Sequence, residues 1–250
     1  MLDIKDIYVQ SVDRRAEGFS AWLWLGFPIA TAVVLSFLGR AEPDFYDAWV
    51  HGEKGLLEMS QAAVMVVAAI LGLFLLVLPV VRQWPALFGW VFLATAGSFY
   101  VAGEELSWGQ HLLNWSTPEY WGAINDQNET NLHNISSWLD QKPRALLEIG
   151  VIFGGIVLPL AALYYTSIRT SWIGIIVPPF LCLPSAVLAE AIRLFERVAD
   201  WTGGDAGALF IRPAEYQEFY FYLFVLFYLI VLGQRLRALQ AHLTSLSEPG

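Results

Sequence analysis

Acidic and imidazole side chains that could activate water or hold a metal are concentrated at residues 103–111, Gly-Glu-Glu-Leu-Ser-Trp-Gly-Gln-His. On a continuous helix, Glu104, Trp108 and His111 would share one face, and Glu105 would be rotated from it by about 100°. One carboxylate of the adjacent pair could then face a site while its neighbour contacts another helix. A positioned Glu or His serves as a general acid or base in hydrolysis, which is the chemistry that this stretch predicts.

A second pair, Glu129 and His133, is spaced so that one helical turn would bring both side chains onto one face. Two imidazoles and several carboxylates suit a divalent metal. Catalytic zinc takes three such protein ligands and a water whose pKa falls to about 7. Zinc is favoured over iron or manganese as the possible metal. The predicted metal ligands are Glu58, Glu105, His111, His133, Glu148 and Glu215.

A site without metal is an equally open interpretation. The chain has no His-Glu-x-x-His motif and no Glu-x-x-His pair of the di-iron bundles. A hydrogen-bonded network of Glu, His, Asn and Trp would use the same residues. The predicted catalytic residues are Glu104, Glu105, His111 and His133. The residues predicted to bind substrate are Trp108, Asn131, Glu190 and Arg193.

Some of these residues have a further interpretation. Arg193 follows Glu190 by three residues, so an ion pair is the favoured role of Glu190. Ser107 precedes His111 by four residues, and Glu104 precedes Ser107 by three, which is the composition of a Ser–His–Glu triad. Side chains so placed on one helix rarely align for attack. Water activation is therefore the favoured chemistry.

The elements that must position these side chains are membrane helices. Hydrophobic residues make up 56% of the 250 residues, charged residues only 15%, and the mean hydropathy is +0.51. Six apolar runs approach the roughly 20 residues that cross a bilayer as a helix. We predict an all-α, polytopic six-helix bundle at 19–238, with an interfacial segment at 1–18 and a tail at 239–250. The predicted spans are Ala21–Leu38, Met59–Val81, Pro85–Gly103, Ala145–Tyr165, Trp172–Ala189 and Phe219–Leu232.

The long connections of this bundle carry most of its acids. Six spans put both termini on one side, called the terminal side, and put connections 39–58, 104–144 and 190–218 on the other, called the loop side. Each side has seven Lys and Arg, but the loop side holds 18 of the 23 acids. The seven basic residues of the terminal side lie in much shorter segments than those of the loop side, which predicts that the terminal side is cytoplasmic. We expect the working face in the long loops, outside the cytoplasm.

Carboxylates from five spans lie at their loop-side ends. Like charges that meet in a bundle cannot all stay ionised without protons, cations or a metal. The helix dipole favours acids at N-termini, whereas Glu104, Glu105 and Glu190 lie at C-terminal ends and need another explanation. The carboxylates in question are Glu58, Glu104, Glu105, Glu148, Glu190, Glu215 and Glu218.

The stretch Gly103–Gly109 resembles the first motif of the CAAX-protease/bacteriocin-immunity (Abi) membrane peptidases, in which two adjacent Glu end a helix. That family has an Arg where this chain has Gly109, and no Phe-x-x-x-His follows here. The resemblance implies that Glu104 and Glu105 activate water. The stretch also resembles uncharacterised bacterial multi-pass membrane proteins. The six-helix plan is similar to membrane hydrolases related to alkaline ceramidases, whose His-x-x-x-His pair is missing here.

The favoured function is an integral-membrane hydrolase of the bacterial inner (plasma) membrane, with a Glu/His site at the extracytoplasmic face. Its substrate would be a lipid, a lipid-linked molecule or a membrane peptide. The first alternative is a non-catalytic subunit whose acidic mouth binds cations or docks a membrane-protein partner. The second is a cation- or proton-coupled transporter, although no acid lies mid-span beside a broken helix pair. The net charge of −9 disfavours nucleic-acid binding.

Overall fold

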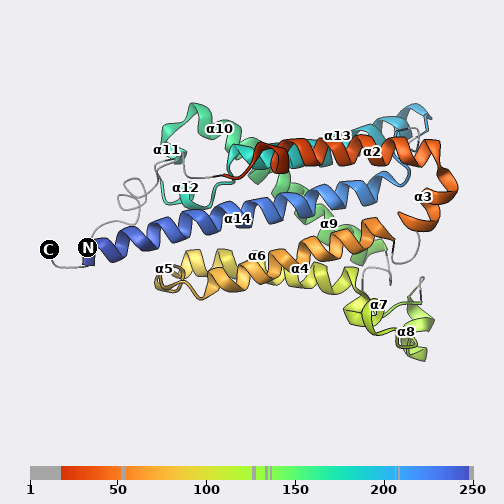
Figure 1. Cartoon of the computed structure of the whole chain (residues 1–250), viewed down its shortest axis with the longest axis horizontal. Coiled ribbons are helices and arrows are strands. Elements are labelled where there is room, and N and C mark those ends of the chain that lie inside the picture. The colour runs from red at the N-terminus through yellow and green to blue at the C-terminus, as the bar shows by residue number, and fades with distance from the viewer. Residues whose placement is uncertain are drawn as a thin grey trace.

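The computed structural model describes residues 18–51, 55–125, 128–132, 135, 137–169, 171–205, 207 and 209–247. These residues form helices and connecting turns, with no β-strand among them (Figure 1). The all-α prediction is confirmed for this part of the chain. The predicted interfacial segment lies, except for Gly18, outside the described residues.

Six helical segments are long and apolar enough to cross a membrane, which confirms the predicted number of spans. The last two extend well beyond the apolar runs that predict them. Their bounds are Trp22–Ala41, Leu56–Leu76, Pro85–Glu105, Lys142–Tyr164, Ile173–Thr202 and Pro213–Leu246.

Most spans correspond to one or two helices of Figure 1. The long helices are α2 (Phe27–Ala41), α4 (Leu56–Leu76), α6 (Pro85–Glu105), α9 (Ser137–Val151), α13 (Leu183–Thr202) and α14 (Pro213–Ser247). The short ones are α3 (Pro43–Trp49), α5 (Pro79–Gln83), α7 (Gln110–Leu113), α8 (Glu119–Ile124), α10 (Leu158–Tyr164), α11 (Thr166–Arg169) and α12 (Ile173–Ile176). α14 continues through most of the segment expected as a tail.

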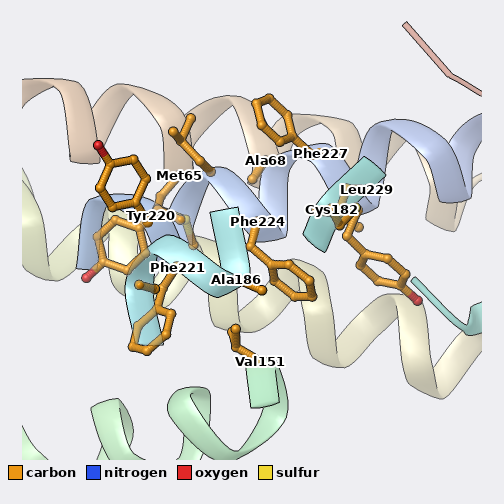
Figure 2. Packing of buried hydrophobic residues seen from close by; sticks show 14 of the residues in the cluster. Met65, Ala68, Val151, Cys182, Ala186, Tyr220, Phe221, Phe224, Phe227 and Leu229 are labelled. Atoms are coloured by element: carbon orange, nitrogen blue, oxygen red, sulfur yellow. The ribbon is translucent and has the colours of Figure 1, made fainter. Parts of the chain in front are cut away.

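Helix α14 is the centre of the bundle (Figure 1). In its most apolar stretch 78% of the residues are buried, against 17% in the first span, so the other spans surround it. Its aromatic side chains fill the interior, and Figure 2 shows Phe221 and Phe224 near Val151 of α9 and Ala186 of α13. Helices in lipid associate through packing, because the lipid tails are as apolar as the side chains. The large rings of α14 supply that packing.

The segment after α9, the π-helical turn Ile152–Val157, approaches α13 and α14 most closely at Gly155. A Cβ added at Gly155 would lie 2.7 Å from Cε2 of Phe224 and 2.9 Å from Cβ of Ala186. We expect Gly155→Leu to lower the free energy of unfolding by about 1–3 kcal/mol, the usual cost of overpacking. Gly150→Leu is the matched control, because a Cβ there meets nothing within 4 Å. Thermal unfolding in mild detergent measures both variants. Equal melting temperatures would contradict the three-helix contact.

The fifth span is broken at Pro178-Pro179, between α12 and α13, because proline lacks the N–H and crowds the preceding turn. Arg235 of α14 donates to carbonyls that the break leaves without helical partners. Its Nη1 lies 3.3 Å from the oxygen of Gly174 and 3.2 Å from that of Ile175, and it also donates to Val177. Non-helical backbone inside a membrane is tolerated where protein groups satisfy it. The prolines therefore interrupt the fifth span completely rather than only bending it.

The two ends of the bundle carry different elements. The connections α5 and α11–α12 lie at the end where α14 finishes, and α3, α7 and α8 lie at the other end (Figure 1). This is the arrangement that six spans require. Which end faces the cytoplasm stays a prediction.

Candidate functional site

The stretch that carries the candidate chemistry is not one continuous helix. After α6, Ser107, Trp108 and Gly109 have positive φ angles of 45°, 53° and 103°. Glycine adopts this conformation freely, whereas other residues pay about 1–3 kcal/mol each, so surrounding contacts must hold the turn. The expected common helical face of Glu104 and His111 is therefore not formed.

His111 is the centre of the site, and each nitrogen of its ring faces a carboxylate. Nε2 lies 2.9 Å from Oε1 of Glu129 and 3.1 Å from Oγ of Ser107. Nδ1 lies 3.7 Å from Oε1 of Glu58, in the first turn of α4. The histidine is buried. A doubly protonated ring has one N–H for each side, so Nε2 can hold Glu129 by a hydrogen bond while the charge of the ring attracts Glu58 across 3.7 Å.

A network of amides fixes Glu129 against His111. Nδ2 of Asn131 donates to Oε2 of Glu129 at 2.7 Å and to Oγ of Ser107 at 3.1 Å. Asn125 donates to the side chain and carbonyl of Asn131 and accepts from the backbone N–H of Glu129. Both asparagines are buried, where such networks are rigid and costly to disturb. Asn131, predicted to bind substrate, lies within this network.

Glu104 anchors the loop that returns to the turn. Its Oε2 accepts from the backbone N–H of Leu132 and its Oε1 from the indole N–H of Trp108, both at 2.7 Å. Thr130 also joins this loop to the turn, because its hydroxyl donates to the carbonyl of Ser107 at 2.8 Å. A buried carboxylate with both oxygens hydrogen-bonded is well compensated. These bonds explain an acid at the unfavourable C-terminal end of α6.

Glu105, the second acid of the pair, contacts a different part of the bundle. Its Oε1 accepts a hydrogen bond of 2.9 Å from the hydroxyl of Tyr222 in α14. One acid of the pair thus meets the loop while the other meets a neighbouring helix. This division is the one that the rotation between adjacent helical positions predicts.

The other predicted metal ligands fall into separate pairs. Glu148 accepts a hydrogen bond of 2.7 Å from Arg197 of α13, and Glu215 lies 2.5 Å from Nδ1 of His51. In the part of the chain that the structure describes, no group of three or more His, Cys, Asp or Glu is placed to hold a metal. His133 lies outside the described residues. A metal centre therefore stays a prediction.

The predicted ion pair between Glu190 and Arg193 is not formed. Arg193 pairs with Glu196, its neighbour one helical turn further along α13, and Arg197 is taken by Glu148. Oε1 of Glu190 is buried without a hydrogen-bond partner. These residues belong to the contact between α9 and α13 rather than to the turn after α6.

The residues of the site differ in how much of each side chain is exposed to solvent. Ser107 has no exposed surface and His111 is nearly covered, whereas the side chain of Glu58 is 32% exposed. Glu58 is thus the member that water or a substrate reaches. Trp108, predicted to bind substrate, is 42% exposed and packs its ring against those of Phe99 and Tyr100.

Ser107, Asn125 and Glu129 are absent from the predicted catalytic, substrate-binding and metal-binding residues, although the sequence suggests Ser107 as a triad member and pairs Glu129 with His133. The structure joins each of them to His111 or Asn131 by hydrogen bonds. The signal that could have found them is the repeated Asn in residues 114–134, since side-chain amides can satisfy both a carboxylate and nearby backbone groups.

No family model, curated protein or solved structure matches this chain. The comparisons neither support nor contradict the resemblance to the CAAX-protease/Abi peptidases. The function has to be argued from the geometry, which offers an imidazole between two carboxylates at one end of a membrane helix bundle.

Proposed function

We propose that this protein is an integral-membrane hydrolase whose acid–base group consists of Glu58, His111 and Glu129. The observation that carries the proposal is the buried His111 ring between Glu129 at 2.9 Å and Glu58 at 3.7 Å. A reactive group oriented by a second group, which is itself held by a third, is the logic of catalytic triads. Here the outermost group, Glu58, is the one that solvent reaches.

Glu58 is the general base of the proposed reaction. Its carboxylate accepts a proton from water while the water oxygen bonds to the carbonyl carbon of an ester or amide. The bond to the leaving oxygen or nitrogen then breaks, and that atom takes the proton from Glu58, which restores the carboxylate. His111 orients Glu58 through Nδ1 and is itself held by Glu129 through Nε2. Catalytic contacts of this kind are often long before substrate binds, as the 3.7 Å separation is here.

The apolar surface near this turn supports a substrate from the bilayer. Leu112, Leu113 and Trp115 follow the turn directly and are 61%, 75% and 38% exposed. Clustered apolar side chains on a surface commonly mark a membrane or ligand contact. We propose a lipid, a lipid-linked molecule or a membrane peptide as substrate. The distribution of Lys and Arg supports a loop side outside the cytoplasm of a bacterial inner membrane.

A divalent metal would change the mechanism but not the place of the site. Glu58 and His111 have the oxygen and nitrogen donors that zinc accepts. Elemental analysis by mass spectrometry, on protein purified in mild detergent without chelator, separates the two mechanisms. Near-stoichiometric zinc that is lost in His111→Ala would show that His111 helps to hold the ion, which would supply Lewis-acid activation of water at this site. Folded, monodisperse protein without metal would support Glu58 as the base.

The non-catalytic alternative has less support, because an acidic docking mouth needs carboxylates that are not already paired. Of the seven carboxylates at the loop-side ends of the spans, all but Glu190 have a partner in the part of the chain that the structure describes. These pairs are Glu58 with His111, Glu104 with Trp108, Glu105 with Tyr222, Glu148 with Arg197, Glu215 with His51 and Glu218 with Arg144.

A product search with the variant His111→Gln tests the proposal. Wild-type protein in nanodiscs is incubated with bacterial lipid extract or with lipid-anchored peptides, and products are identified by mass spectrometry. We expect His111→Gln to form product about 10²-fold more slowly, because Glu58 loses the group that orients it. His242→Gln, the same substitution near the end of α14, should keep the rate. An equal rate in His111→Gln, or no product from any substrate, would refute the proposal.

A further inference from the structure

A cavity of about 480 Å³ lies beside the broken fifth span. The elements α10 and α12 beside it lie at the opposite end of the bundle from α7, the helix that contains His111 (Figure 1). Its wall is formed by the start of the first span, by α10 and by the segment that joins α12 to α13. Most of the lining is apolar and includes Phe19, Trp24, Leu163 and Leu181. A cavity of this volume is within the range of ligand sites, roughly 300–1,000 Å³.

Arg235 is the charged member of the lining among the described residues. Its side chain is buried, with 7% of the residue exposed, and the carbonyls of Gly174, Ile175 and Val177 fix its position. A guanidinium keeps its charge at all physiological pH values, and its planar fork matches the oxygens of a phosphate. The cavity thus combines an apolar wall with one fixed guanidinium group.

We propose that this cavity binds an anionic phospholipid from the leaflet at the terminal side of the bundle. The phosphate meets Arg235, and the upper part of an acyl chain lies along Phe19, Trp24 and Leu181. A lipid fits better than a free anion, because most of the wall is apolar and it is built from spans that lie in the bilayer. Basic pockets between membrane helices are known to hold acidic headgroups.

The bound lipid would cover the interruption of the fifth span. Gly174 and Val177 line the cavity and also accept hydrogen bonds from Arg235. The same guanidinium would therefore contact both the bound lipid and the backbone carbonyls of the interrupted span. A ligand that binds only the folded protein raises its stability by an amount that grows with the logarithm of the ligand concentration. The inference is independent of the hydrolase proposal, since it concerns the other end of the molecule.

Native mass spectrometry of the delipidated full chain tests this site with three probes: phosphatidylglycerol, phosphatidylcholine of the same chain length, and inorganic phosphate. We expect one phosphatidylglycerol per protein, with about tenfold weaker retention of phosphatidylcholine. Inorganic phosphate should not compete, because it lacks the acyl chain. Equal retention of both lipids would overturn the proposal. Displacement of the lipid by phosphate would assign the site to a free anion instead.

Paired substitutions at the cavity wall separate charge from folding. Leu163→Glu places a negative charge at the lining, and Leu163→Gln is its neutral match, so we expect about tenfold weaker phosphatidylglycerol binding in Leu163→Glu only. Arg235→Gln should lose the lipid, whereas Arg237→Gln, an exposed basic residue of the same helix, should keep it. If Arg235→Gln fails to fold, the Leu163 pair decides. Equal binding by both Leu163 variants would refute the proposal.

Discussion

The variant Glu58→Gln should turn over substrate about 10²–10⁴-fold more slowly than the wild type, the range that a positioned general base contributes. Glutamine keeps the size of the side chain but cannot accept the proton of the attacking water. His111 would remain between Glu129 and the new amide, so the loss reports on the base itself. Initial rates on the substrate found by the product search, in nanodiscs, measure the effect.

Two controls make this result specific. Glu58 lies in the first turn of α4, where a carboxylate favours the helix by about 0.3–1 kcal/mol, so Glu58→Gln should melt only slightly earlier. Glu119→Gln, an exposed acid in the first turn of α8, should lose a similar increment of stability and none of the activity. Equal rates for Glu58→Gln and Glu119→Gln would remove Glu58 from the mechanism.

Ser107 distinguishes water activation from a serine nucleophile. Its Oγ lies 3.1 Å from Nε2 of His111 and 2.7 Å from Oε2 of Glu129. A Ser–His–Glu triad would contain the same three residue types. The residue has no exposed surface, however, so no substrate carbonyl reaches it in this arrangement. Ser107→Ala should therefore keep most of the activity, and a complete loss with intact folding would favour the nucleophile.

The number of spans was predictable because backbone polar groups inside lipid force apolar runs into helices. The length of the last spans was not, since hydropathy records composition and ignores pairing. Charged residues end the apolar run of the fifth span from Glu190 onward, yet Arg193 and Glu196 among them pair with each other on α13 and the helix continues. Arg235 ends the run of the sixth span in the same way, although it binds carbonyls inside the bundle.

The location of the candidate site was predictable, but its geometry was not. Residues 103–111 show the acids and the imidazole, and a continuous helix is the natural extrapolation of α6. The helix instead ends in a turn at Ser107 and Trp108, which have positive φ angles. Non-glycine residues adopt positive φ only where tertiary contacts impose it, so the local sequence does not predict this turn. Those contacts come from Glu129 and its neighbours, which are more than fifteen residues away in the sequence. The hydrophobic periodicity of a short segment contains no information about such distant contacts.

The ion pair between α9 and α14 should be sensitive to the loss of one partner. Arg144 donates from Nε to Oε1 of Glu218 at 2.8 Å and also from Nη2, and both side chains are 20% exposed. Removing one member of a buried pair leaves a desolvated charge, which costs about 3–5 kcal/mol, and the low end applies to this partly exposed pair. We therefore expect Arg144→Met to lower the free energy of unfolding by about 3 kcal/mol, measured by denaturant titration in mixed micelles.

The double variant Arg144→Met/Glu218→Met tests the cause of that loss. Two apolar side chains of similar volume leave no charge behind, so the double variant should recover most of the stability. Arg212→Met is the matched control, because Arg212 is 62% exposed in its pair with Glu215 and should contribute at most about 1 kcal/mol. A double variant as unstable as Arg144→Met would mean that packing of the arginine stem, rather than charge pairing, joins α9 to α14. Recovery would show that the bundle tolerates the Glu218 carboxylate at this position because Arg144 compensates its charge.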